Sequence, residues 1–353
     1  MLAEAAALRR VVLEVTQACN HRCIHCYNYW ERSPQGILAA DTLVRSEIRE
    51  LLARIRQDAP LEQVVISGGE PVLRPDLPEI LNDLVEDGLA PMVISNTALL
   101  TDELAARLPQ QTQVETTLFS ADKQLHDRIA GPTGAFDRTI NGIVAARVRG
   151  CSVAVSVVVS AINAHDVYRT IELALGLGAE AILLNRVNLT PRLLKDSPQV
   201  VPTLEQLKQA LSAAESVAAM YETMVAISVP IPPCLVEPAD YPHLHFSFCP
   251  RGDDNAYYTI SHNGLLRPCN HSSVILGDLR HERFADLICA ARTREFWTPE
   301  PAECRRCTHP LAGACRGGCP AASDECCGSR MQIDPLVQHL RAQTARIAPC
   351  PAR

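Results

Sequence analysis

Residues 10–27 read RVVLEVTQACNHRCIHCY, and residues 63–71 read QVVISGGEP. Each segment opens with a short apolar run rich in β-branched residues, which is typical of a buried strand. The first run leads directly into Cys19-x3-Cys23-x2-Cys26, and the second leads into Gly68-Gly69-Glu70-Pro71. The sequence therefore predicts two strands, each followed at its carboxyl end by a loop of chemically distinctive residues.

The alternation of apolar runs and amphipathic segments continues to about residue 190. Near-continuous apolar strands separated by helices indicate a parallel sheet covered by helices, and six such units can form a partial barrel. A capping box at Thr203 and Gln206 then predicts a helix to Tyr221, and His262-Asn263-Gly264 predicts a hairpin turn. The expected fold class is α/β, a partial (β/α)6 barrel followed by a small cysteine-rich domain with short β-hairpins. We predict strands at 10–16, 63–67, 91–95, 114–119, 153–159 and 181–187, and helices at 76–86, 101–108, 136–149, 166–175 and from an N-cap at Asp41 through Ile55.

The composition excludes several classes of function. The 353 residues are 47% hydrophobic and 21% charged, which is typical of a globular protein. The net charge of −7, without a basic block, argues against nucleic acid as a partner. The longest apolar stretch, residues 152–162, is too short to span a membrane, and residues 1–10 lack the apolar segment of a secretory signal. We therefore expect a cytoplasmic protein with neither nucleic-acid nor membrane partners.

The fifteen cysteines are clustered at the two ends of the chain. Clustered cysteines in an intracellular protein indicate metal ligands before they indicate disulfides, and the odd total rules out complete pairing. The spacing of Cys19, Cys23 and Cys26 suits three corners of an iron–sulfur cluster, with the fourth iron left for a non-protein ligand. A zinc site completed by His21 or His25 is the alternative from spacing alone.

Together and in this order, the cysteine loop and the Gly-Gly-Glu-Pro loop resemble the two leading motifs of the radical S-adenosylmethionine (SAM) superfamily. The resemblance implies that Cys19, Cys23 and Cys26 hold a [4Fe–4S] cluster to which SAM binds. It also implies that Gly68 and Gly69 allow the methionine part of SAM to approach, and that Glu70 accepts a hydrogen bond from its ammonium group. The further SAM contacts that it implies are His25, Asn96, Ser120 and Asp122.

The C-terminal cysteines resemble the SPASM extension of radical SAM proteins, which holds one or two auxiliary [4Fe–4S] clusters. Cys249-x14-Gly264-x4-Cys269 fits that pattern well, whereas the seven residues between Cys307 and Cys315 exceed the usual five. The resemblance assigns Cys249, Cys269 and Cys319 to a first auxiliary cluster, with Cys234 as the preferred fourth ligand. The alternatives for that fourth position are an open iron, His243, His245 or Asp253. The second auxiliary cluster is assigned Cys304, Cys307, Cys315 and either Cys326 or Cys327.

These features together predict the organisation 1–200 for the partial barrel, 201–233 for a bridging helix and linker, 234–335 for the SPASM domain and 336–353 for a C-terminal helix and tail. The resemblance implies an oxidoreductase that cleaves SAM to a 5′-deoxyadenosyl radical and removes hydrogen from an unactivated carbon. The expected substrate is a ribosomally synthesised peptide, with a separate leader-binding partner because only about ten residues precede the first strand. A flavodoxin- or ferredoxin-type protein is the expected reductant. Dehydrogenation of an aminoglycoside or nucleoside sugar is the alternative, and a non-catalytic iron–sulfur or zinc protein the remote one.

Overall fold

The computed structural model describes residues 8–28, 41–252 and 256–347. Its centre is one open sheet of eleven strands in the order β11-β10-β9-β1-β2-β3-β4-β5-β6-β7-β8. The neighbours from β1 through β8 are all parallel, as the near-continuous apolar strands predict. These strands are Arg10–Glu14 (β1), Gln63–Ser67 (β2), Ala90–Ile94 (β3), Gln113–Thr117 (β4), Ser152–Val159 (β5), Ala181–Arg186 (β6), Val225–Ile227 (β7) and Leu244–Phe246 (β8).

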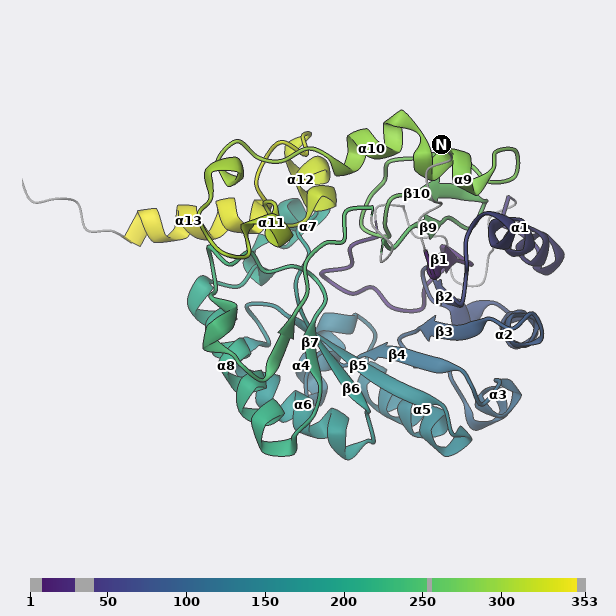
Figure 1. Cartoon of the computed structure of the whole chain (residues 1–353). Coiled ribbons are helices and arrows are strands. Elements are labelled where there is room, and N and C mark those ends of the chain that lie inside the picture. The colour runs from purple at the N-terminus through teal and green to yellow at the C-terminus, as the bar shows by residue number, and fades with distance from the viewer. Residues whose placement is uncertain (1–7, 29–40, 253–255, 348–353) are drawn as a thin grey trace, which may run out of the picture.

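Helices follow the strands in turn and surround the sheet (Figure 1). They cover it because each presents an apolar stripe, such as Ile48, Leu51, Leu52 and Ile55. The predicted Thr203–Gln206 capping box is confirmed, with its two side chains bonding reciprocally to backbone amides. The helices are Arg45–Asp58 (α1), Leu77–Glu86 (α2), Asp102–Arg107 (α3), Lys123–Ala130 (α4), Ala135–Arg149 (α5), Val167–Gly176 (α6), Pro191–Asp196 (α7) and Leu204–Tyr221 (α8).

One local prediction is wrong, and one helix near the site was missed. Asp41 is not the N-cap of α1; that position belongs to Val44, whose backbone N–H donates to Glu47 Oε2 at 2.8 Å. Asp41 instead accepts a hydrogen bond from Asn263 Nδ2, at 3.0 Å, in the distant hairpin turn. The short helix α4 was not predicted, although Asp122 caps it by accepting from the Leu125 N–H at 2.8 Å.

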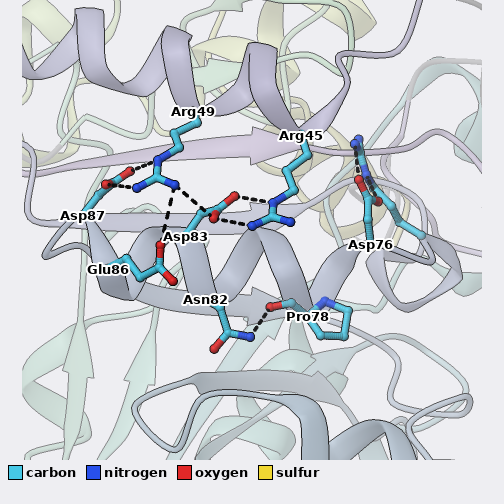
Figure 2. A network of polar contacts seen from close by, with 9 residues as sticks. Arg45, Arg49, Asp76, Pro78, Asn82, Asp83, Glu86 and Asp87 are labelled. Carbon is cyan, nitrogen blue, oxygen red and sulfur yellow. Dashed lines mark hydrogen bonds and ion pairs between the residues drawn. The ribbon is translucent and has the colours of Figure 1, made fainter.

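The outer layer is fastened by ion pairs between α1 and α2, shown in Figure 2. Arg45 makes a two-pronged contact with Asp83 at 2.5 and 2.6 Å. Arg49 reaches both Asp87, at 2.7 Å, and Asp83, at 3.3 Å. These contacts hold the two helices side by side over the strands that precede the two motif loops.

The C-terminal region is built from much shorter elements. The predicted hairpin is confirmed, and its strand β9 pairs in parallel with β1, so this region shares the main sheet instead of forming its own. Helices α11, α12 and α13 gather at the top left of Figure 1. The remaining elements are Thr259–Ile260 (β9), Leu265–Arg267 (β10), Gly277–Asp278 (β11), Phe284–Cys289 (α9), Ala291–Trp297 (α10), Ala312–Cys315 (α11), Pro320–Cys327 (α12) and Pro335–Ile347 (α13).

Two buried ion pairs join this region to the barrel strands. Arg267 of β10 pairs with Glu14 at the end of β1, and both side chains are almost fully buried. Arg186 at the end of β6 pairs with Asp334, before α13, at 2.5 Å, and both side chains are completely buried. No helix in the described part of the chain has the length and apolar character needed to cross a membrane.

Candidate functional site

The loop with the three N-terminal cysteines follows β1 and is hydrogen-bonded to the end of helix α4, which was not predicted. The Arg22 N–H donates to Ala130 O at 2.8 Å, and the Ile24 N–H donates to Ile129 O at 3.1 Å. Gly131, with φ of +102°, ends α4 so close to the loop that an added Cβ would lie 3.1 Å from the Arg22 Cβ. The loop carrying Cys19, Cys23 and Cys26 is therefore fixed by tertiary contacts on its far side.

All three thiols of this loop are partly exposed. Among the residues that the structure describes, no three Cys, His, Asp or Glu side chains converge on a position for a single metal ion. The thiolates of an iron–sulfur cluster bind different irons, so they need no such convergence. The donor set, three thiols in one anchored loop, has the chemistry that a [4Fe–4S] cluster requires.

The two glycines of the next motif are explained by the cysteine loop. A Cβ on Gly68 would lie 2.3 Å from Thr16 O, and a Cβ on Gly69 would lie 2.1 Å from Ala18 O. The backbones are also bonded, because the Gly69 N–H donates to Thr16 O at 2.8 Å and the Glu70 N–H donates to Ala18 O at 2.7 Å. The described contacts thus require glycine for the close approach of two loops, whereas a role in admitting SAM stays a prediction.

Glu70 is buried, with 1% of its surface exposed. Its Oε1 accepts from Ser95 Oγ at 2.6 Å and from the Val72 N–H at 3.1 Å, and its Oε2 accepts from the Asn96 N–H at 2.8 Å. Burial raises the pKa of the carboxyl group, and these hydrogen bonds oppose the rise. Glu70 therefore joins the loop after β2 to the loop after β3, directly beside the cysteine loop.

Asn96 follows β3 and faces the cysteine loop. Its amide Nδ2 donates to Asn20 Oδ1 at 2.7 Å, and its Oδ1 accepts from the Ala98 N–H at 3.0 Å. The next residue, Thr97, has φ of +54°, a conformation that a β-branched residue rarely adopts and that is enriched at functional sites. Gly142 permits this turn, since a Cβ there would lie 2.1 Å from Thr97 O. Thr97 and Gly142 were not predicted from the sequence.

Ser120 and Asp122 lie after β4 on the same edge of the sheet. Ser120 Oγ donates to the buried carboxylate of Asp166, and the Ala121 N–H donates to Asp166 Oδ2 at 2.9 Å. Asp122 also borders a surface pocket of about 450 Å³, together with Arg128, His165 and Arg169. Both predicted SAM contacts thus have structural partners of their own.

His25 is buried against Phe119, with ring centroids 5.1 Å apart. Its Nδ1 has no hydrogen-bond partner among the described residues, and burial lowers its pKa to about 4. An unpartnered buried ring nitrogen beside Cys26 is a place where a bound molecule gains a hydrogen bond. The free ring nitrogen and the three thiols are groups that SAM and an iron–sulfur cluster can use, and their assignment to these cofactors stays a prediction.

The polar groups around Tyr27 were not singled out from the sequence. Tyr27 accepts from Asn270 Nδ2 at 3.1 Å and packs edge-on against His271, with ring centroids 4.5 Å apart. Burial and nearby carboxylates, including Glu14 and Glu115, raise the pKa of Tyr27. Burial also raises the pKa of Glu115 to about 7. This group links the loop after Cys26 to the segment after Cys269.

Cys249, Cys269 and Cys319, the three residues predicted to share the first auxiliary cluster, lie near one another, and their role as ligands stays a prediction. Cys319 belongs to a small hydrophobic cluster with Phe296 and Trp297, and Cys249 and Cys269 pack against that cluster. Burial raises the pKa of Cys319 to about 12, with contributions from Asp334 and Cys249. Arg251, which was not predicted, donates to Pro299 O at 2.8 Å and Gly318 O at 3.3 Å, beside these thiols.

Cys234, the predicted fourth ligand of the first auxiliary cluster, has a different set of thiols beside it. Burial raises the pKa of the Cys234 thiol, and the nearby Cys307 adds to the rise. Cys234 is in turn near enough to Cys304 and Cys315 to contribute to their raised pKa values. Two residues proposed as alternatives for the first cluster also lie elsewhere: His243 pairs with Glu215 of α8, and His245 is exposed on β8. The last alternative, Asp253, lies outside the described residues.

Cys326 and Cys327 occupy the end of α12. Cys326 Sγ donates to Leu189 O, after β6, at 3.3 Å. Cys327 Sγ accepts from Gln338 Nε2, on α13, at 3.8 Å. The strongest charges on Cys326 come from Cys327, Asp334, Glu325 and Arg186, not from the three cysteines predicted to share its cluster.

Two family models match the chain. Residues 13–174 match the radical SAM superfamily, and residues 249–308 match the SPASM iron–sulfur cluster-binding domain. The chain therefore belongs to the radical SAM superfamily and to its SPASM subfamily. It is a radical SAM enzyme, and the predicted cofactors, SAM and iron–sulfur clusters, are those that define the two matched families.

Several named proteins are similar to this chain. A PqqA peptide cyclase of Rhodopseudomonas palustris is 28% identical over 76% of this chain and 68% of its own length. A PqqA peptide cyclase of Methylocella silvestris is 26% identical over 96% of this chain and 89% of its own length. An AdoMet-dependent heme synthase of Methanosarcina barkeri is 32% identical, but over 51% of each chain.

Solved structures share the fold. The structure of anSMEcpe with bound AdoMet and the Cp18Cys peptide covers 97% of both chains, with a TM-score of 0.71 and 16% identity. Streptococcus suis SuiB bound to the precursor peptide SuiA covers 93% of this chain and 75% of its own, with a TM-score of 0.69 and 13% identity. The likeness at these identities confirms the α/β fold with its cysteine-rich extension.

Proposed function

We propose that this radical SAM enzyme oxidises or cross-links a ribosomally synthesised peptide. The observation that carries the proposal is the extent of the similarity to PqqA peptide cyclases, which in one relative includes 96% of this chain and hence both cysteine-rich regions. The similarity to the heme synthase covers 51% of the chain. The similarity to peptide cyclases along nearly the whole chain therefore favours a peptide substrate over an aminoglycoside or nucleoside sugar.

The loop of Cys19, Cys23 and Cys26 is proposed to hold the SAM-binding cluster. When bound, the cluster and SAM would supply a 5′-deoxyadenosyl radical that takes hydrogen from an unactivated carbon. The auxiliary clusters would supply electron acceptors. The backbone N–H of Glu70 holds the second motif against the cysteine loop. Its carboxylate Oε2 accepts one hydrogen bond and so has a second lone pair for an ammonium group. The ring Nδ1 of His25 is available for a further hydrogen bond.

The protein's own part is to bind, orient and exclude water. The side chains of Tyr27 and Glu115 contribute polar groups between the two metal-binding regions. The buried Glu14–Arg267 pair holds β1 and β10 together at this place. We propose that a peptide reaches these groups, presented by a separate leader-binding protein, and that a flavodoxin- or ferredoxin-type protein delivers the electrons.

The test uses anaerobically reconstituted protein with SAM and a chemical reductant. We expect 5′-deoxyadenosine from the wild type and none from the Cys19/Cys23/Cys26→Ala variant. A PqqA peptide and an aminoglycoside are then offered separately, and substrate-dependent 5′-deoxyadenosine is measured with the mass of each product. Loss of a hydrogen pair from the peptide supports the proposal. Turnover of the aminoglycoside with an unchanged peptide would overturn the choice of substrate class.

A further inference from the structure

The segment after β7 lies against the first part of the C-terminal cysteine cluster. Glu237 Oε2 and His309 Nε2 are 2.8 Å apart, joining a residue three positions after Cys234 to one two positions after Cys307. Arg341 of α13 is hydrogen-bonded to the Cys234 thiol and pairs with Glu303 Oε2 at 2.7 Å. These two sets of side-chain contacts therefore hold the segment of Cys234 close to the segment that carries Cys304 and Cys307.

A glycine turn after Cys315 brings the other cysteines of this group together. The Gly318 N–H donates to Cys315 O at 2.9 Å and closes this turn. Gly317 packs on Cys304 so closely that an added Cβ would lie 3.3 Å from its sulfur. The sulfur of Cys304 therefore lies against the turn that follows Cys315, and both cysteines carry the thiol donors that an iron–sulfur cluster takes.

The two cysteines at the end of α12 belong to another environment. Cys326 is directed to the backbone after β6, and Cys327 contacts Gln338 of α13. Arg186 and Asp334, which form the buried pair at the junction, are among the charges that act on Cys326. The order of cysteines in the sequence nevertheless predicts one of these two as the fourth ligand of the second auxiliary cluster.

We propose that Cys234, together with Cys304, Cys307 and Cys315, holds the second auxiliary cluster, and that Cys326 and Cys327 do not ligate it. The inference rests on the proposed function, because it assumes that the C-terminal region carries two iron–sulfur clusters. It also means that the first auxiliary cluster has three cysteine ligands, Cys249, Cys269 and Cys319. Its fourth iron is then left to a ligand other than Cys234.

The experiment is made in the Cys19/Cys23/Cys26→Ala background, so that all remaining iron reports on the C-terminal region. Iron, labile sulfide and electron paramagnetic resonance spectra are measured on reconstituted full-length protein. The variants are Cys234→Ala, Cys234→Ser and, as the matched control, Cys326→Ala/Cys327→Ala. Circular dichroism confirms folding in each case; Cys234 is exposed, so its substitution leaves the core intact.

The parent is expected to hold about eight irons per chain, four in each of two cubane clusters. Cys234→Ala is expected to lose about four irons, or about one with the appearance of a three-iron signal. Cys234→Ser, which keeps an oxygen donor, should retain more iron with a shifted spectrum, and the control should match the parent. An unchanged Cys234→Ala spectrum, or iron loss in the control, would overturn the assignment. A parent without iron would instead reject the proposed cluster content itself, and the assignment with it.

Discussion

The barrel and the C-terminal region achieve their folds by different means. Barrel strands such as β5 have eight residues and helices such as α8 have 18, whereas β9 has two residues and α11 has four. Helix α8 is capped by the hydroxyl of Thr203, but α12 is capped by the sulfur of Cys319, a weaker acceptor. The barrel is thus held by regular packing, while the C-terminal region lacks the elements to do the same. We expect metal ligation to supply the difference.

Iron removal should separate the two regions most clearly. We expect a chelator to lower amide protection by at least about tenfold across residues 256–334, because ligand bonds there would supplement the packing of short elements. The barrel strands β2 to β6 should keep their protection. Hydrogen exchange of the loaded and stripped protein, followed by mass spectrometry, measures both regions in one sample. Simultaneous loss of protection in the barrel would refute the distinction.

Breaking the junction between the regions should have the next largest effect. Arg186→Met leaves the buried carboxylate of Asp334 without its partner, which should destabilise the contact by about 3–5 kcal/mol. The effect is measured as faster amide exchange in β6 and at residues 328–340. Arg107→Met, which removes an ion pair with Glu79 that is half exposed, is the control and should cost less than about 1 kcal/mol. Equal effects from the two substitutions would show that the junction is not special.

The raised pKa of Glu115 should make the stability of the barrel depend on pH. Because its pKa is raised from 4.5 to about 7, the folded protein keeps a proton that the unfolded chain releases. This contribution to stability is therefore lost as the pH rises from about 4.5 to about 7. Glu115→Gln, always neutral, should become more stable relative to the wild type across that window. Melting temperatures measured at several pH values give the comparison, and parallel curves for the two proteins would contradict it.

The smallest expected effect concerns regular structure alone. Thr203→Ala removes the capping hydroxyl of α8 and should cost about 1 kcal/mol. The loss should be seen as faster amide exchange in the first turn of α8, with iron content unchanged. Gln206→Ala removes the other half of the capping box and serves as the companion variant. A drop in iron content with either substitution would show that the two regions are more tightly coupled than proposed.

Prediction from the sequence succeeded where local pattern controls the structure. The strand at Gln63–Ser67 has the predicted bounds, because β-branched residues and the following glycines define it locally. The N-cap of α1 was placed wrongly, since Asp41 is drawn away by the hairpin turn around Asn263. Helix α4 was missed, although its role in holding the cysteine loop is large. A contact between segments that are distant in sequence explains the first error, whereas α4 has a local signal, the cap at Asp122, that was overlooked.

The candidate site divides in the same way. Residues 10–27 and 63–71 are enough to predict the two motif loops and the edge of the sheet at which both loops lie. The partners of Glu70 and the strained turn at Thr97 do not, since they depend on which loops meet at the end of the sheet. The reason for Gly68 and Gly69 also came from the structure, which places backbone oxygens where a Cβ would stand.

The sequence by itself determined the order of strands and helices, the thiol loop after β1 and the family to which the chain is similar. Each depends on residues close together in the chain, where spacing and side-chain type suffice. Only the tertiary structure places Cys234 beside the segment that carries Cys304 and Cys307. Cys234 and Cys304 are separated by 70 positions in the sequence (304 − 234), and Arg341 and His309 bring their segments together. Spacing cannot show such a meeting, because the path of the intervening chain sets it.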